Sequence, residues 1–180
     1  MERNVTHIAL FAALIAVLGL VPRIDLAAGV PITAQSLGIM LCGTVLGAKR
    51  GALAVLLFLV LVAAGLPLLS GGRGGLGVFA SPSVGFLVGF PVAAFVAGRV
   101  MERTTLAPGI AAGAAAVIGG IGVLYLFGIP GMAVMLDKTL PEAARIAIAF
   151  LPGDIIKAGV AGVVTAALAR MRPGALLSRA

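Results

Sequence analysis

Of the 180 residues, 61% are hydrophobic and only 11% are charged, and the mean hydropathy is +1.21. A soluble domain carries about 25% charged residues, so the composition excludes one and predicts an all-α integral membrane protein. The net charge of +7 comes from basic residues scattered at the ends of apolar runs, which argues against nucleic acid as a partner. The single cysteine, Cys42, excludes a disulfide within the chain.

The chain has room for six membrane-spanning helices in a single membrane domain, residues 1–180, because about 20 apolar residues cross a bilayer. The predicted spans are residues 5–22, 32–48, 51–69, 83–100, 108–128 and 153–170. A signal peptide would begin like the first run, but no convincing small-x-small cleavage site follows, so we expect this span to be retained. The 26 glycines suit membrane helices that pack by close backbone approach.

Six spans place both termini on one side of the membrane and the loops 23–31, 70–82 and 129–152 on the other. The terminal side has eight basic residues, namely Arg3, Lys49, Arg50, Arg99, Arg103, Arg170, Arg172 and Arg179. The other side has four, namely Arg23, Arg73, Lys138 and Arg145, with Lys157 at the boundary. The positive-inside rule then predicts cytoplasmic termini for a multi-pass protein of the cell membrane. The three loops therefore converge on the outer face, where a solute would be captured.

The start of the sixth span carries the sequence Phe-Leu-Pro-Gly-Asp-Ile-Ile-Lys, residues 150–157. With Pro152 at the first helical position, Asp154 falls in the first turn, where the helix dipole favours an anion. Lys157 lies three residues on and shares that face. A charge costs roughly 2.5–3.5 kcal/mol in mid-membrane, so this pair needs a reason. It is either a self-neutralising structural bridge or the polar floor of a ligand pocket.

The segment before this stretch predicts a short surface helix. Thr139 and Glu142, with Pro141 between them, form the pattern of a helix start with a capping box. One helix over 141–171 would be about 46 Å long, more than the roughly 30 Å hydrocarbon core. We therefore expect a break at Pro152–Gly153, with the sixth span after it.

The loop 70–82 is rich in glycine and contains Gly72-x-Gly74-x-x-Gly77, which matches a dinucleotide-binding fingerprint. It follows an apolar helix rather than a strand, so nucleotide binding is not expected. We interpret the loop as a lid over a site; a merely compliant loop is the alternative. Phe79 is a candidate for covering an apolar ligand ring.

Other residues inside or near the spans are ambiguous. Gln35 lies just inside the second span, where an unsatisfied amide is costly, so it needs a partner, either protein or ligand. Phe86 and Phe90 share one face of the fourth span and are by default packing or lipid-facing residues.

The sequence shows no apparatus for catalysis. The stretch Gly43-x-x-x-Gly47-Ala48-Lys49 lacks the spacing and the Lys-Ser/Thr ending of a phosphate loop, so we expect no ATPase site. His7 has no second histidine near it, and neither a serine elbow nor a paired-carboxylate motif is present. We expect no enzyme, no metal and no cofactor.

With these motifs in hand, the chain resembles the BioY family, the biotin-specific S components of energy-coupling factor (ECF) transporters. The resemblance extends over nearly the whole length and rests on residues 9–16, 30–38, 71–77, 82–90 and 150–157. The sequence departs from the family pattern at Ala34, Ser83 and Phe86, where members often have Leu, Thr and Tyr.

The resemblance implies the six-helix ECF S-component fold and a high-affinity biotin pocket near the outer side. The ligand-binding residues it implies, together with the residues noted above, are Asp154, Lys157, Arg73, Gln35, Phe79, Gly75 and Phe86. It also implies partners: a transmembrane T component and two ATPase subunits, which would use ATP to release biotin inward. The small-residue face of the first span, Ala9, Ala12, Ala13 and Ala16, is similar to the surface that meets the T component.

Two other functions remain open at this point. An S component for a different small vitamin would share the fold, although the sequence at 150–157 argues against it. A structural membrane protein without any solute would tolerate substitution of Asp154.

Overall fold

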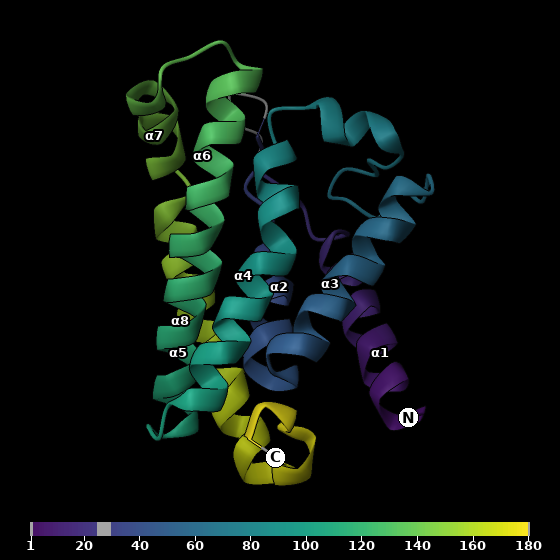
Figure 1. Cartoon of the computed structure of the whole chain (residues 1–180), viewed down its shortest axis with the longest axis vertical. Helices are drawn as coiled ribbons and strands as arrows, with labels where there is room; N and C mark the ends of the chain where they lie inside the picture. The colour runs from purple at the N-terminus through teal and green to yellow at the C-terminus, as the bar shows by residue number, and fades with distance from the viewer. Residues whose placement is uncertain (1, 25–29, 180) are drawn as a thin grey trace.

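The computed structural model describes residues 2–24 and 30–179, which form helices joined by turns, with two isolated antiparallel bridges. The main helices are α1 (Glu2–Leu18), α2 (Gln35–Leu46), α3 (Ala48–Ala63), α4 (Val84–Arg103), α5 (Pro108–Val117), α6 (Leu124–Met135), α7 (Leu140–Ile148) and α8 (Leu151–Met171). A π-helical segment, η2 (Ile118–Val123), joins α5 to α6, and 3₁₀ turns lie at η1 (Leu76–Ala80), η3 (Pro173–Ala175) and η4 (Leu177–Arg179). The long helices run side by side as a bundle (Figure 1).

Within the described part of the chain, three helices are long and apolar enough to cross a membrane, namely Val84–Arg103, Pro108–Met135 and Leu151–Met171. They correspond to the predicted fourth, fifth and sixth spans, so the chain is an all-helical membrane protein. In place of the first three spans stand α1, α2 and α3, with 17, 12 and 16 residues. These are shorter than the roughly 20 residues of a perpendicular crossing. Six crossings therefore stay a prediction.

Several predicted boundaries differ from the structure. The helix of the fifth span continues to Met135 through Pro130, which is tolerated where neighbouring helices pack around it. The first and third spans end earlier than predicted, at Leu18 and Ala63. The chain stays apolar after both helix ends. After Ala63 it turns at Gly65, whose φ of 105° excludes most other residues.

The second and third spans are joined by one residue, Gly47, which has a φ of 84°. The predicted spans 32–48 and 51–69 leave Lys49 and Arg50 as the turn between them, which is wrong, because both residues lie in the first turn of α3. This sharp reversal holds their side chains beside the end of α4.

Glycines set the distances between helices, as expected for membrane helices. A Cβ on Gly43 of α2 would lie 2.5 Å from the carbonyl oxygen of Ala94 in α4, and one on Gly131 of α6 would lie 2.5 Å from the Cα of Gly85. Any side chain at these positions would push α4 away from its neighbours.

The two ends of the chain lie at the same end of the bundle, and the glycine-rich loop and α7 lie at the other (Figure 1). This agrees with the predicted convergence of the loops 70–82 and 129–152. Residues 25–29, the middle of the predicted first outer loop, and the side chain of Arg3 lie outside the described residues.

The capping box of α7 is confirmed. One carboxylate oxygen of Glu142, Oε2, accepts hydrogen bonds from the backbone nitrogen of Thr139 at 2.8 Å and from its hydroxyl at 2.7 Å. The break after α7 exists but lies earlier than predicted. The helix ends at Ile148 and α8 starts at Leu151, so Pro152 lies inside the first turn of α8, where its missing N–H costs nothing.

Candidate functional site

A buried ion pair lies in the first turns of α8. The Nζ atom of Lys157 is 2.8 Å from Oδ1 of Asp154, and the two side chains are 16% and 7% exposed. Both side chains come from the first two turns of α8, which follow Phe150. The positive end of the α8 dipole adds to the stabilisation of the Asp154 carboxylate. The structure therefore joins the pair that the sequence singled out.

Two hydroxyl groups from other helices complete this cluster. Ser36 at the start of α2 donates to Oδ1 of Asp154 at 3.3 Å and accepts from Lys157 at 2.9 Å. The hydroxyl of Tyr125 on α6 donates to Oδ2 of Asp154 at 2.8 Å. The carboxylate thus accepts three hydrogen bonds from three helices, which satisfies it in a poorly hydrated place.

Aromatic rings enclose the side of the cluster. Phe86 on α4 meets Tyr125 edge to face, with ring centroids 6.3 Å apart, and meets Phe150 in the same way at 6.0 Å. Phe86 and Phe90 are each 8% exposed. Neither faces lipid, so that part of the default interpretation is wrong.

The cluster and the rings line a cavity with an empty volume of about 600 Å³, which includes the space of its open side. The cavity lies at the end of the bundle opposite to the chain termini, between the starts of α2, α4 and α8. Its lining consists of Val30, Pro31, Ile32, Thr33, Gln35, Ser36, Leu69, Arg73, Ser83, Phe86, Leu87, Phe90, Leu124, Phe150, Asp154 and Lys157.

Gln35 borders the cavity but its amide bonds to protein. Its Nε2 donates to the carbonyl oxygens of Ile15 at 3.1 Å and Leu68 at 3.0 Å, and its Oε1 accepts from the backbone nitrogen of Ser70 at 3.0 Å. We call this set of contacts the Gln35 clasp. It ties the start of α2 to the end of α1 and to the loop after α3, and it gives the amide the partners that its burial requires.

The glycine-rich loop forms one rim of the cavity. Leu69 and Arg73 pair as an antiparallel bridge around two left-handed glycines, and Nε of Arg73 donates to the carbonyl oxygen of Ser70 at 3.4 Å. Arg23, from the first outer loop, donates to the same oxygen at 2.9 Å. The loop is thus held from two sides and presents Arg73 to the cavity.

Five of the seven predicted ligand-binding residues line the cavity, namely Asp154, Lys157, Arg73, Gln35 and Phe86. The other two do not: Gly75 bonds through its nitrogen to the carbonyl oxygen of Val62, and Phe79 packs against the hydrophobic core. For these two, contact with a ligand stays a prediction.

The predicted partner-binding face of α1 is only partly available. Ala9 and Ala13 are exposed and Ala16 is half-buried, whereas Ala12 is 3% exposed. Ala12 therefore packs in the core of this structure, and its contact with a partner stays a prediction.

Sequence reasoning missed the role of Tyr125 and assigned none to Ser36. The signal for Tyr125 was available, since it is the only tyrosine of the chain and lies in an apolar run. A buried phenol usually finds a hydrogen-bond partner. Its hydroxyl reaches the cluster beside Phe86. At the position of Phe86 itself, the family pattern often has a tyrosine.

The profile of the BioY family matches residues 2–174. The biotin transporter BioY of Rhodobacter capsulatus is 53% identical, covering 99% of this chain and 100% of that protein. The biotin transporter BioY of Rhizobium etli is 53% identical over 90% of both chains.

A solved structure, the S-component for biotin from an ECF-type ABC transporter, superposes with a TM-score of 0.89. It shares 30% sequence identity and covers 94% of this chain and 92% of its own. The match in profile, sequence and fold extends over nearly the full length, and the chain therefore belongs to the BioY family.

Proposed function

We propose that this chain is the biotin-binding and uptake subunit of a membrane vitamin transporter. It captures biotin in the cavity around Asp154 and Lys157 and releases it inward when an ATP-driven module acts on it. The names of the relatives and the solved S-component support the substrate. The observation that carries the proposal for this chain is a 600 Å³ cavity with one buried ion pair on its wall.

The chemistry of the cavity matches biotin group by group. The ureido ring has two N–H donors and one carbonyl acceptor, the fused ring is apolar, and the tail ends in a carboxylate. Asp154 supplies acceptor oxygens, while Lys157 and Arg73 supply donors for the carbonyl and the carboxylate. Phe86, Phe90 and apolar neighbours suit the rings and the hydrocarbon tail.

The Asp154–Lys157 contact preorganises the site. The two charges neutralise each other at 2.8 Å. Lys157 has three N–H donors and gives two to Asp154 and Ser36, so one remains for a ligand. Biotin would enter between the charges and take over part of these bonds.

Membrane placement and partners complete the proposal. The chain crosses the cell membrane six times, with both termini in the cytoplasm and the cavity open to the outside. α1 meets a T component through Ala9 and Ala13, and two ATPase subunits hydrolyse the ATP that drives release. The basic residues at the terminal end support this orientation.

Binding of radiolabelled biotin to the purified chain tests the proposal. We expect Asp154→Asn and Lys157→Ala each to weaken binding by about 10- to 100-fold, since a hydrogen bond to a charged group contributes roughly 1.5–3 kcal/mol. Arg145→Gln, at the same end on exposed α7, is the control and should bind normally.

Unchanged affinity in both cavity variants would refute the assignment of the pocket. Mass spectrometry of the ligand that copurifies with the chain tests the substrate separately, and a different vitamin in the same cavity would refute biotin alone.

A further inference from the structure

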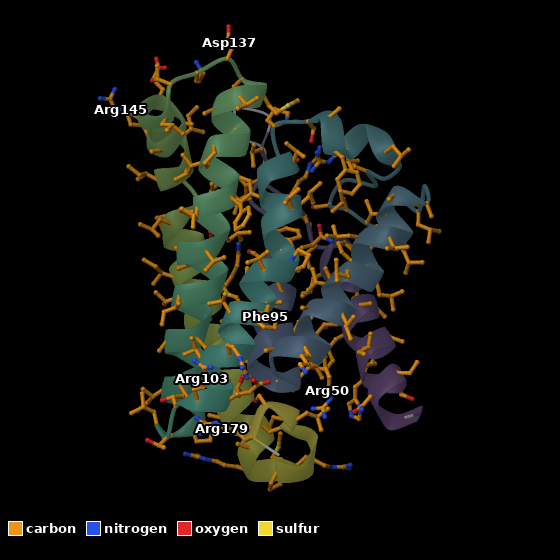
Figure 2. All side chains as sticks on the ribbon, in the orientation of Figure 1. Arg50, Phe95, Arg103, Asp137, Arg145 and Arg179 are labelled. Carbon is orange, nitrogen blue, oxygen red and sulfur yellow. The ribbon has the colours of Figure 1, made fainter. Side chains whose placement is uncertain are left out.

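A second hollow lies at the opposite end of the bundle, beside the chain termini. It forms where the starts of α1 and α3, the end of α4 and the C-terminal turn η4 meet, with an empty volume of about 1560 Å³ that includes its open side. Its lining consists of Asn4, Leu46, Ala48, Lys49, Arg50, Phe95, Arg99, Glu102, Arg103, Thr104, Thr105, Leu177, Ser178 and Arg179. We call it the terminal groove; Figure 2 shows Arg50, Arg103 and Arg179 near this end.

The terminal groove has an excess of positive charge. Among the side chains that the structure describes, its lining includes five basic ones and a single carboxylate, that of Glu102. Both oxygens of this carboxylate have partners: Oε1 accepts from the backbone nitrogen of Ala48 at 2.8 Å, and Oε2 from Arg99 at 3.1 Å. Glu102 is therefore unable to neutralise the other cations.

Two of the cations have no partner among the residues that the structure describes. Lys49 and Arg103 are exposed and make no hydrogen bond or ion pair within residues 2–24 and 30–179. Arg50 and Arg179 donate to the carbonyl oxygens of Leu177 at 3.4 Å and Leu106 at 3.0 Å. A guanidinium keeps further N–H donors after one such bond, so the groove has donors available for an anion.

The wall of the groove on α4 continues into an apolar stripe. Val88, Val92 and Phe95 are 53%, 37% and 39% exposed, and they follow one another at helical spacing. A shallow hollow beside them is lined by Val96 and Val100 together with Arg99, Arg103 and Thr104, and these last three also line the terminal groove. One face of α4 thus changes from apolar to cationic at Arg99.

An apolar stripe that leads into a cationic groove fits an amphiphile with a negatively charged head group. A free anion would need the cations but not the stripe, and a wholly apolar ligand would need only the stripe. α4 is long and apolar enough to span a membrane, so its exposed valines face acyl chains and its last turn lies at the level of the head groups.

We propose that the terminal groove binds the phosphate of an anionic phospholipid, with one acyl chain along the exposed stripe of α4. Guanidinium groups pair with phosphate oxygens through two parallel hydrogen bonds, and clustered basic residues between helices favour anionic head groups. The inference does not depend on the identity of the ligand in the other cavity.

Lipid binding to the purified chain tests this inference. The probes are phosphatidylglycerol, phosphatidylcholine with the same acyl chains, and inorganic phosphate, added to the detergent-solubilised protein and followed by native mass spectrometry and by the unfolding temperature. The variant is Lys49→Gln with Arg103→Gln, because neither side chain has a partner whose loss would disturb the described fold. The matched control is Arg170→Gln with Arg172→Gln, which removes the same charge at the same end outside the groove.

We expect phosphatidylglycerol to bind and to raise the unfolding temperature, and the groove variant to bind it about 25-fold more weakly, at about fivefold for each removed cation near the head group. The control should bind as the unchanged protein does. Each single substitution is also measured, since a fivefold loss is still detectable if the double variant does not fold. Equal binding by groove variant and control, equal binding of phosphatidylcholine, or the same stabilisation by inorganic phosphate would overturn the inference.

Discussion

Two neighbouring residues on α2, Gln35 and Ser36, belong to polar clusters with opposite character. The Gln35 clasp joins one side chain to three backbone groups, and both of its N–H donors are used. Ser36 belongs to a cluster of side chains with Asp154, Lys157 and Tyr125, where a lysine N–H remains available. The first arrangement fixes the position of the chain, whereas the second can exchange partners. Polarity at a cavity wall therefore does not by itself identify a ligand contact; unused hydrogen-bonding capacity does.

The largest effect on stability is expected at the clasp. Gln35→Leu keeps the volume but leaves the carbonyl oxygen of Leu68 and the backbone N–H of Ser70 unpaired, whereas the carbonyl oxygen of Ile15 keeps its bond from the nitrogen of Gly19. Each buried unpaired group costs about 1–3 kcal/mol. We expect the free energy of unfolding to fall by about 3 kcal/mol or more, measured by denaturation in detergent. Ser36→Ala is the matched control, and its stability loss should be smaller, about 1–1.5 kcal/mol, because Asp154 and Lys157 still pair with each other. Equal losses in the two variants would contradict the distinction between the clusters.

A smaller effect is expected at the edge of the ligand cluster. Tyr125→Phe removes only the hydroxyl that donates to Asp154 and keeps the ring against Phe86. This bond forms without ligand and its acceptor is charged, so its loss should lower the free energy of unfolding by about 1.5–3 kcal/mol. The less firmly held carboxylate should bind biotin about two- to tenfold more weakly, measured by calorimetry, which corresponds to about 0.5–1.5 kcal/mol. Normal affinity in this variant would show that Tyr125 only fills space.

The smallest effect is expected at an exposed polar pair, the capping box of α7. Hydrogen bonds from Thr139 hold the pKa of the Glu142 carboxyl below its ordinary value. The cap therefore stabilises α7 above the ordinary pKa of glutamate and is lost as the pH falls through the lowered one. Hydrogen exchange at the start of α7 should accelerate on acidification beyond the intrinsic pH dependence of exchange. Glu142→Gln, which does not titrate, should remove that extra change; if it persists, another group is responsible.

Much of the site could be predicted from the sequence because charges stand out in an apolar chain. Asp154 and Lys157 are costly near a membrane span, which marked them as candidates for a ligand pocket. Phe86 was added to the predicted site by the resemblance to the family. Tyr125 was missed because it lies 29 positions earlier in the sequence, and only the tertiary fold brings its hydroxyl, from the start of α6, to Asp154. Gln35 was left between protein and ligand because a pattern along the chain does not reveal that the carbonyl oxygen of Leu68 lies within its reach.

Helix ends were harder to predict than helices. Hydropathy continues past Leu18 and Ala63, since Leu20 and Leu66 are as apolar as the helices before them. What ends these helices is backbone geometry, including the left-handed turn at Gly65, and hydropathy does not record it.

The single cysteine, Cys42, lies buried on α2, between the Gln35 and Ser36 end of that helix and the terminal groove. Because the chain has no other thiol, a membrane-permeant maleimide would modify one defined site, and only in molecules whose helices have separated around it. The rate of that labelling would measure how often the bundle opens. Comparing the rate with and without biotin would report that motion in the protein without any substitution.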